Sequence, residues 1–403
     1  MPLTLSLPTT DGRLEQYTLS EAAPWRAPAQ PVFNRIAFSA AHVVTNPRAA
    51  IDPWLDCAID WDSTLAYRRR LWSMGLGVAE AMDTAQRGMG LDWPTSLELV
   101  RRSLDAARDV PGALIASGCG TDSLAPNAAR SIDDVIHAYE DQMAAIEKLG
   151  GRLILMASRA LARVASGPDD YERVYDRLLS QAHQPVILHW LGDMFDPALK
   201  GYWGSNDIDA AMATALAVIN THPDKVDGIK ISLLDKDKEI AMRRRLPAVG
   251  GPDGQGVRMY TGDDFNYAEL IAGDAGGSSG NQGKSDALLG IFDAIAPAAS
   301  AALAELAAGN EARFHQILAP TVPLSRHVFR APTRFYKTGV VFMAWINGHQ
   351  DHFVMVGGQQ STRSMPHFAE LFKLADAAGL IEQPGLATRR MKTLLELHGV
   401  FDA

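Results

Sequence analysis

The lysine of the segment VDGIKIS, Lys230, has the sequence context of a residue that does covalent chemistry. It stands among apolar residues in a segment typical of a strand buried on both faces. Burial removes the hydration of an ammonium group, lowers the pKa of the lysine and favours the neutral amine. A neutral amine attacks carbonyl groups and forms a Schiff base. The alternative interpretation is a lysine that pairs with an internal carboxylate and only stabilises the fold.

A histidine, His189, lies in the preceding strand-like segment, PVILHWL. A neutral imidazole at this position can transfer protons to and from a substrate near physiological pH. A histidine hydrogen-bonded within the core has the same sequence context, so the structural interpretation stays open. The pattern predicts that Lys230 and His189 form the centre of the chemistry.

Acidic and hydroxyl side chains follow several other strand-like segments. A small-residue turn followed by acids is also typical of any junction between a strand and a helix, where the acid caps the helix. Each residue is therefore a candidate for substrate binding or for a cap. The candidates are Glu80, Asp83 and Thr84 in AEAMDTAQ, Asp122 in SGCGTDS, and Asp263 and Asp264 in TGDD.

These candidates all need a scaffold that brings the ends of strands together. Short apolar segments alternate with helical patterns up to about residue 285, which predicts parallel strands separated by helices. Eight such segments predict the α/β class and a (β/α)₈ TIM barrel, whose active site lies at the carboxyl ends of the strands. The predicted strands are NRIAFSA (34–40), GLGVAEAM (75–82), GALIASG (112–118), RLILMAS (152–158), PVILHWL (185–191), VDGIKIS (226–232), VRMYTG (257–262) and ELIAGD (269–274).

Three regions are expected along the chain: an N-terminal extension over 1–32, the barrel over 33–300 and a helical region over 301–403. The third is expected because 286–308 and later segments have helical periodicity with no strands between them. The apolar stretch at 339–346 fits a strand or a buried helix equally well.

Composition excludes several classes of protein. The 403 residues carry a formal net charge of −9, so no basic surface is expected for nucleic acid. Two cysteines are too few for a disulfide framework or for a zinc site of paired CxxC units. No apolar run reaches the roughly 20 residues of a membrane span, and the amino terminus lacks a signal-peptide pattern. We therefore expect a cytoplasmic protein with neither nucleic acid nor membrane as a partner.

Four short motifs around Lys230 resemble, in order, those of the dihydrodipicolinate synthase and N-acetylneuraminate lyase family. VDGIKIS resembles the family's GIK strand with its Schiff-base lysine, PVILHWLGD resembles PVILYN, and MYTGDDF resembles SGDD. GDAGGSSGNQ resembles the Gly-rich eighth-strand segment, whose trailing Ser-Asn pair makes Asn281 a candidate substrate ligand. The resemblance implies a divergent branch of these class I aldolase barrels, with a C-terminal helical extension. It also implies a covalent lysine without another cofactor, 2-keto acid chemistry, and a homo-oligomer, either a tetramer or a dimer.

The sequence departs from this family at positions that bear on substrate binding and proton transfer. His189 replaces the tyrosine that acts there as general acid and base. AMDTAQ replaces the family's GTTGE motif: Thr84 keeps a hydroxyl, whereas Asp83 would repel an anionic carboxylate. MASRAL replaces an aromatic pair, and its Arg159 is expected to bind an anion or to pair with Asp122 or Asp83. The family's lysine-biosynthesis reaction should therefore not be transferred.

Residues and resemblance together predict a lyase, an aldolase or a dehydratase, that acts on a keto acid, keto sugar or sugar acid. Lys230 forms the Schiff base, and His189 and Thr84 complete the catalytic set. Acids around the mouth suit hydroxyl groups, which connects the prediction with carbohydrate metabolism. The expected substrate-binding residues are Glu80, Asp83, Asp122, Arg159, Asp263, Asp264 and Asn281.

The alternative is a sugar isomerase or epimerase on the same barrel that depends on a divalent metal. Glu80, Asp122, His189 and a further acid would then be metal ligands, and Lys230 would be only an electrostatic helper. A ligand-binding barrel without activity is a third interpretation, against which the retained lysine argues.

Overall fold

The computed structural model describes three stretches of the chain: residues 3–20, 23–274 and 283–401. The chain divides into two compact units, which we call the barrel unit and the helical unit. The barrel unit consists of Arg35–Ala41 and Leu76–Gly290. The helical unit consists of Met1–Asn34, His42–Gly75 and Ile291–Ala403.

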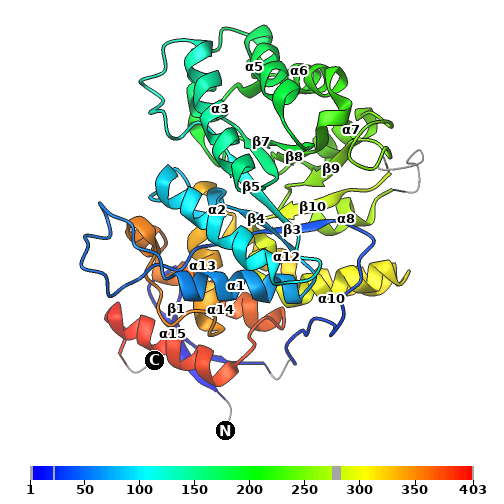
Figure 1. Ribbon diagram of the computed structural model, residues 1–403. Coiled ribbons are helices and arrows are strands. Elements are labelled where there is room, and N and C mark those ends of the chain that lie inside the picture. The colour runs from blue at the N-terminus through cyan, green and yellow to red at the C-terminus, as the bar shows by residue number, and fades with distance from the viewer. Residues whose placement is uncertain (1–2, 21–22, 275–282, 402–403) are drawn as a thin grey trace. The chain divides into compact units, whose positions relative to one another are not determined.

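The barrel unit contains eight parallel strands that close into a barrel in the order β10-β3-β4-β5-β6-β7-β8-β9 (Figure 1). This closed barrel with its alternating helices confirms the predicted TIM-barrel fold. The strands are β3 (Ala37–Ala40), β4 (Gly77–Glu80), β5 (Ile115–Cys119), β6 (Leu153–Met156), β7 (Val186–Leu191), β8 (Val226–Ser232), β9 (Arg258–Thr261) and β10 (Asp286–Leu289).

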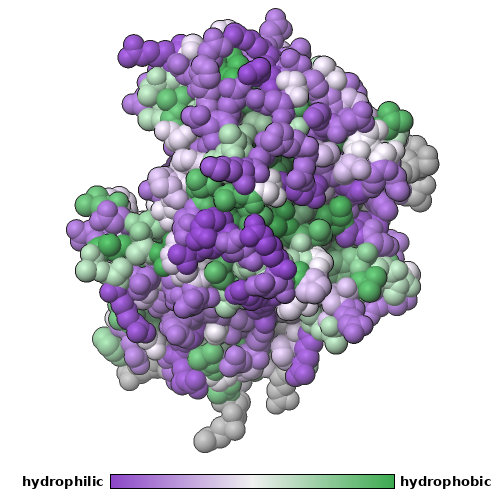
Figure 2. All heavy atoms as spheres, in the orientation of Figure 1, coloured by the Kyte–Doolittle hydropathy of each residue, from purple (hydrophilic) through white to green (hydrophobic). Residues whose placement is uncertain are grey.

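Helices follow the strands and bury one face each. Helix α3 begins with a capping box, in which the Ser131 hydroxyl accepts from the Asp134 amide and the Asp134 carboxylate accepts from the Ser131 amide. The outer surface over α3, α5 and α6 is mainly hydrophilic (Figure 2). The helices are α2 (Trp93–Arg108), α3 (Ile132–Lys148), α4 (Arg159–Val164), α5 (Pro168–Gln181), α6 (Ile208–Thr221), α7 (Lys236–Arg245) and α8 (Tyr267–Ala272).

The eighth strand is not the predicted one. The prediction of a strand over 269–274 is wrong, because this segment belongs largely to α8. The eighth strand is β10, whose DALL sequence was predicted to be the start of a helix over 286–308. All four residues of β10 are buried, so the strand lacks the alternation of apolar and polar residues that marks a half-buried strand.

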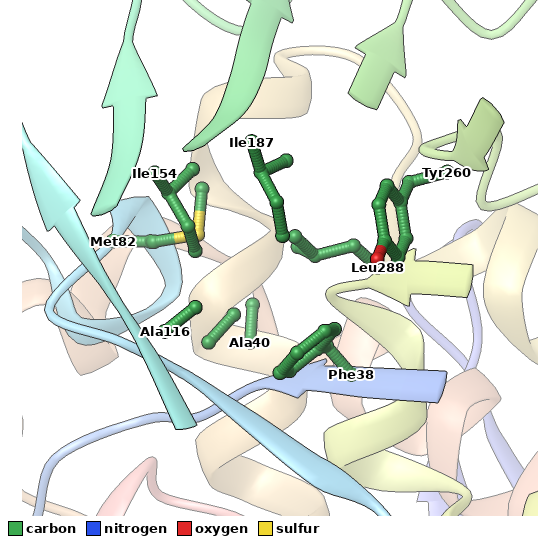
Figure 3. Close-up of a cluster of buried hydrophobic side chains, with 9 residues drawn as sticks. Phe38, Ala40, Met82, Ala116, Ile154, Ile187, Tyr260 and Leu288 are labelled. Atoms are coloured by element: carbon green, nitrogen blue, oxygen red, sulfur yellow. The ribbon is translucent and has the colours of Figure 1, made fainter. Parts of the chain in front are cut away.

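Apolar side chains fill the interior of the barrel (Figure 3). They come from seven of its strands and from the turn after β4. Because successive strand residues point to opposite faces, the inward-facing Ile187 places His189 in the interior two positions further along β7. The core cluster consists of Phe38, Ala40, Ala79, Met82, Ala116, Ile154, Ile187, Tyr260 and Leu288.

Charged side chains form a network at the amino ends of the strands. The buried carboxylate of Asp227 accepts a hydrogen bond of 2.8 Å from the Tyr260 hydroxyl. It also forms ion pairs with Arg152 at 3.2 Å and Arg258 at 3.3 Å. Arg258 in turn pairs with Asp286 at 3.2 Å. Each buried charge here therefore has an opposite charge beside it.

The helical unit combines an N-terminal hairpin with helices. Asp376 of α14 accepts hydrogen bonds from the Tyr17 hydroxyl at 2.6 Å and the Ser20 amide at 2.7 Å, which fixes the hairpin to this helix. The apolar stretch at 339–346 forms part of the buried helix α13 and not a strand. The elements are β1 (Thr4–Pro8), β2 (Leu14–Thr18), α1 (Trp61–Ser73), α9 (Ile291–Ala294), α10 (Ala296–Ala307), α11 (Glu311–Leu318), α12 (Thr321–Val328), α13 (Tyr336–Ile346), α14 (Met365–Ala377) and α15 (Pro384–Leu397). None of the helices in the described stretches is both long and apolar enough to cross a bilayer.

Candidate active site

Lys230 and His189 lie side by side in the barrel, because β7 and β8 pair in a register that joins these two residues. Both are buried, with 5% of Lys230 and 2% of His189 exposed. Lys230 forms no hydrogen bond or ion pair with any residue that the structure describes. The Nδ1 atom of His189 is buried without a partner, and its Nε2 atom lies 3.5 Å from the Ser232 hydroxyl.

Burial shifts the pKa values of both residues toward their neutral forms. It lowers the pKa of Lys230, although the negative charges of Asp83, Asp264 and Glu239 oppose the shift. It lowers the pKa of His189 to about 3, with a further contribution from the charge of Lys230. The imidazole is therefore neutral at physiological pH.

A pocket of about 200 Å³ opens at the carboxyl ends of the strands. His189 forms part of its wall, whereas Lys230 lies on the neighbouring strand and is not among the lining residues. Thr121 and Ser158 contribute hydroxyl groups 2.6 Å apart. The polar lining residues are Asp83, Arg87, Thr121, Asp122, Ser158, Arg159, His189 and Asp196.

The three candidates at the end of β4 and in the turn after it, Glu80, Asp83 and Thr84, lie in different surroundings. Asp83 lines the pocket, at the start of the short helix η1 (Asp83–Ala85). Thr84 is buried in η1 and is not among the lining residues. Glu80 faces α2, where its carboxylate accepts hydrogen bonds from the Ser103 hydroxyl at 2.6 Å and the Ala81 amide at 2.8 Å. Alternation along β4 explains this direction, because the neighbouring Ala79 faces inward. Glu80 is therefore not placed to bind substrate in the pocket.

Asp122 lines the pocket but is held by an arginine that the sequence analysis missed. Arg87 donates from Nε at 2.9 Å and from Nη2 at 2.6 Å to the two oxygens of Asp122. Gln142 donates to the same carboxylate at 2.9 Å. Burial alone would raise the pKa of Asp122, but these hydrogen bonds and the charge of Arg87 outweigh burial and lower it. Asp122 is thus the partner of Arg87. The only sequence signal for Arg87 was its position directly before Gly88 in the turn after β4.

Arg159 begins α4 and lines the pocket. Its Nε atom donates to Asp196, so its partner is neither Asp122 nor Asp83 as the sequence suggested. The guanidinium lies against Gly88, where an added Cβ would stand 2.6 Å from Nη1. The positive φ of Gly88, 71°, favours glycine, and a Cβ there would displace the end of the Arg159 side chain.

The two acids after β9 do not line the pocket. Asp263 accepts hydrogen bonds from the backbone amides of Phe265 at 2.8 Å and Asn266 at 3.0 Å, so it caps the turn that follows the strand. Asp264 is also buried, and its charge acts on Lys230. We therefore assign Asp263 a structural contact and Asp264 an electrostatic effect on the lysine.

A third acid near Lys230, Glu239, was not predicted. It lies in the first turn of α7, is fully buried, and accepts a hydrogen bond of 3.2 Å from the Gly262 amide. Burial raises its pKa well above the usual value, and the charge of Asp263 raises it further. Its position within the charged segment KDKEIAMRRR resembles that of a solvated surface residue, which is why the sequence did not identify it.

The last candidate, Asn281, lies outside the described residues. The described stretches contain no group of three or more His, Cys, Asp or Glu side chains placed to hold a metal ion. Two ligands of the metal-dependent alternative are engaged elsewhere, Glu80 with Ser103 and Asp122 with Arg87.

Comparison with known proteins found one family model and several solved structures of the dihydrodipicolinate synthase type. A family model described as "Protein of unknown function (DUF993)" matches residues 5–400. A putative dihydrodipicolinate synthetase from Pseudomonas aeruginosa is 15% identical, with a TM-score of 0.57 over 83% of this chain and 99% of that one. A dihydrodipicolinate synthase from Oceanobacillus iheyensis is 14% identical, with a TM-score of 0.58 over 84% and 95%.

A third similar structure is YagE, a prophage protein of the dihydrodipicolinic acid synthase family from E. coli K12, which was solved in complex with pyruvate. It is 11% identical, with a TM-score of 0.60 over 92% of this chain and 100% of that one. No curated protein matches the sequence. At these identities the similarity concerns the fold, and at that level it confirms the resemblance.

Proposed function

This chain belongs to the DUF993 family of proteins of unknown function, and we propose that it is a Schiff-base-forming lyase, an aldolase or a dehydratase. The carrying observation is the pair of Lys230 and His189, which are buried and in register on adjacent strands, with His189 in the wall of the pocket. A buried lysine without a hydrogen-bond partner among the described residues is costly, which supports a functional interpretation. The likeness of the fold to dihydrodipicolinate synthases supports the same class of chemistry.

The chain's own residues suffice for the proposed steps. The Lys230 amine adds to the carbonyl carbon, and loss of water from the adduct gives an imine, which takes up a proton from solvent and becomes an iminium ion. The iminium withdraws electrons from the neighbouring carbon and so stabilises the carbanion or enamine that cleavage or elimination produces. The neutral His189 accepts the proton that the substrate releases. Ser232 offers a hydroxyl beside His189, whereas Thr84 of the predicted catalytic set is buried outside the pocket lining.

The pocket wall favours a hydroxylated substrate. Thr121, Ser158 and Asp83 present oxygen atoms that exchange hydrogen bonds with hydroxyl groups. We therefore propose a keto sugar, a sugar acid or another hydroxylated keto acid as the substrate class. A cytoplasmic homo-oligomer is part of the same proposal, and light scattering on the purified protein tests the assembly.

Trapping of the covalent intermediate tests the proposal. The protein is incubated with a panel of keto acids and keto sugars, reduced with borohydride, and weighed intact by mass spectrometry. We expect an adduct on the wild type that is lost in Lys230→Met and kept in Lys148→Met, which changes an exposed lysine of α3. The proposal fails if no panel member gives an adduct, or if Lys230→Met retains it. Activity that a chelator abolishes would instead favour the metal-dependent isomerase.

A further inference from the structure

Two arginines line the pocket, and one of them is saturated by the protein. Arg87 donates from Nε and Nη2 to Asp122, from Nη1 to the carbonyl oxygens of Gly118 and Ala81, and from Nη2 to Gln142. Only 5% of it is exposed. A guanidinium whose N–H groups are used in this way holds the wall together and has little capacity for a ligand.

The other arginine, Arg159, keeps most of its donors free. It donates from Nε to Asp196, and its Nη1 and Nη2 atoms form no hydrogen bond with any described residue. Its side chain is 36% exposed where it lines the pocket. Asp196 accepts a hydrogen bond from one edge of the guanidinium, and Gly88 leaves room for its Nη1 atom. The free edge has the planar, two-pronged geometry that binds carboxylate and phosphate groups.

The charges around Arg159 differ from the charges around Lys230 and His189. Asp122 and Asp196 are each compensated by an arginine. Arg159 follows β6, and β7 with His189 separates that strand from β8 with Lys230, so the guanidinium and the amine belong to non-adjacent strands of the barrel. Asp83 also lines the pocket, and its negative charge acts on Lys230 and His189 and disfavours an anion beside them. An anion at Arg159 meets an attractive charge instead.

We infer that Arg159 binds an oxyanion at the end of the substrate remote from the carbonyl that reacts with Lys230. The inference rests on the proposed Schiff-base function and narrows its substrate class. The substrate is a hydroxylated ketone or aldehyde that carries a carboxylate or phosphate several bonds from the carbonyl, in preference to a 2-keto acid with adjacent groups. Asp196 is the positioning residue that orients the guanidinium.

Four probes in the borohydride experiment test this inference: fructose, fructose 6-phosphate, 5-ketogluconate and pyruvate. The measured quantity is the probe concentration that gives half-maximal adduct. For wild type we expect a remote anion to lower this concentration roughly 10- to 100-fold relative to fructose, the range of a charged hydrogen bond. Whichever of fructose 6-phosphate and 5-ketogluconate is favoured identifies phosphate or carboxylate as the bound group. Pyruvate has no anion remote from its carbonyl, so its half-maximal concentration should not be lowered relative to that of fructose.

Variants assign the preference to the guanidinium. Arg159→Gln should abolish it, and Asp196→Asn should weaken it. Arg163→Gln should leave it unchanged, since Arg163 lies on the same helix and donates to the carbonyls of Pro126 and Ala129. Inorganic phosphate and malonate should compete with the anionic probes on the wild type, which tests the site even if a variant misfolds.

The outcomes separate the inference from the function on which it rests. Adducts on Lys230 with equal concentrations for charged and neutral probes, or an unchanged preference in Arg159→Gln, overturn the anion site and leave the Schiff-base proposal standing. Absence of an adduct with every probe, and with the wider panel, overturns the Schiff-base proposal and the anion site with it.

Discussion

Asp227 at the amino end of the barrel and the pair of Lys230 and His189 toward its carboxyl end are held in opposite ways. At the amino end, Asp227 is held by the Tyr260 hydroxyl and by two arginines. Toward the carboxyl end, Lys230 has no hydrogen-bond partner among the described residues, and His189 leaves one ring nitrogen buried and unpaired. Pairing stabilises the charge of Asp227, whereas burial lowers the pKa values of Lys230 and His189. The difference agrees with the general division of such barrels into a stabilising and a catalytic face.

The largest effect on stability is expected at the paired end. Asp227→Ala leaves Arg152 and Arg258 without this partner and removes the acceptor of Tyr260. Removal of one member of a buried pair typically costs about 3 to 5 kcal/mol, and we expect the free energy of unfolding to fall by about 3 kcal/mol. Urea denaturation measures this change. The folded variant should still form the borohydride-trapped adduct, and loss of the adduct from folded protein would contradict the division between the ends.

Acidification should lower the free energy of unfolding through His189, whose Nδ1 atom is buried without a partner. The pKa of His189 is about 3 in the folded protein and about 6.5 when unfolded, so the unfolded state binds the proton first as the pH falls. Stability from this group is complete above pH 6.5 or so and is lost progressively toward pH 3. At pH 5 the loss amounts to about 2 kcal/mol.

Urea denaturation of matched variants at pH 7 and pH 5 measures how much His189 contributes to the loss of stability on acidification. His189→Asn should lose less stability on acidification than wild type, because no imidazole remains to be protonated. His183→Asn, which changes an exposed histidine, should behave as wild type. Equal acid sensitivity of His189→Asn and wild type would mean that the imidazole is not held neutral by burial.

Most of the fold could be predicted because strand ends and helix caps are local signals. Seven of the eight barrel strands correspond to predicted segments. The eighth was missed because the predicted segment became α8, while DALL in β10 is four buried residues inside an apolar stretch. Periodicity cannot distinguish a short strand buried on both faces from the first turn of a helix.

The candidate site was predictable to the extent that it depends on neighbouring strands. Lys230 and His189 end up together because their segments form adjacent parallel strands. The pairing of Arg87 with Asp122, across two different strand-to-helix connections, depends on the tertiary arrangement and leaves no local pattern. The direction of Glu80 follows from strand alternation, but only after the bounds of β4 are known.

The smallest effect on stability is expected from Lys230, the proposed Schiff-base residue. Lys230→Met replaces an amine that has no hydrogen-bond partner among the described residues by an apolar chain of similar length. Because this removes the desolvation cost of a buried amine, the free energy of unfolding should change by no more than about 1 kcal/mol, and in the stabilising direction if at all. Lys148→Met on the surface of α3 provides the reference in the same urea titration. A loss of about 3 kcal/mol would instead make Lys230 a structural partner of Asp83 or Asp264, and the two ends of the barrel would then be alike.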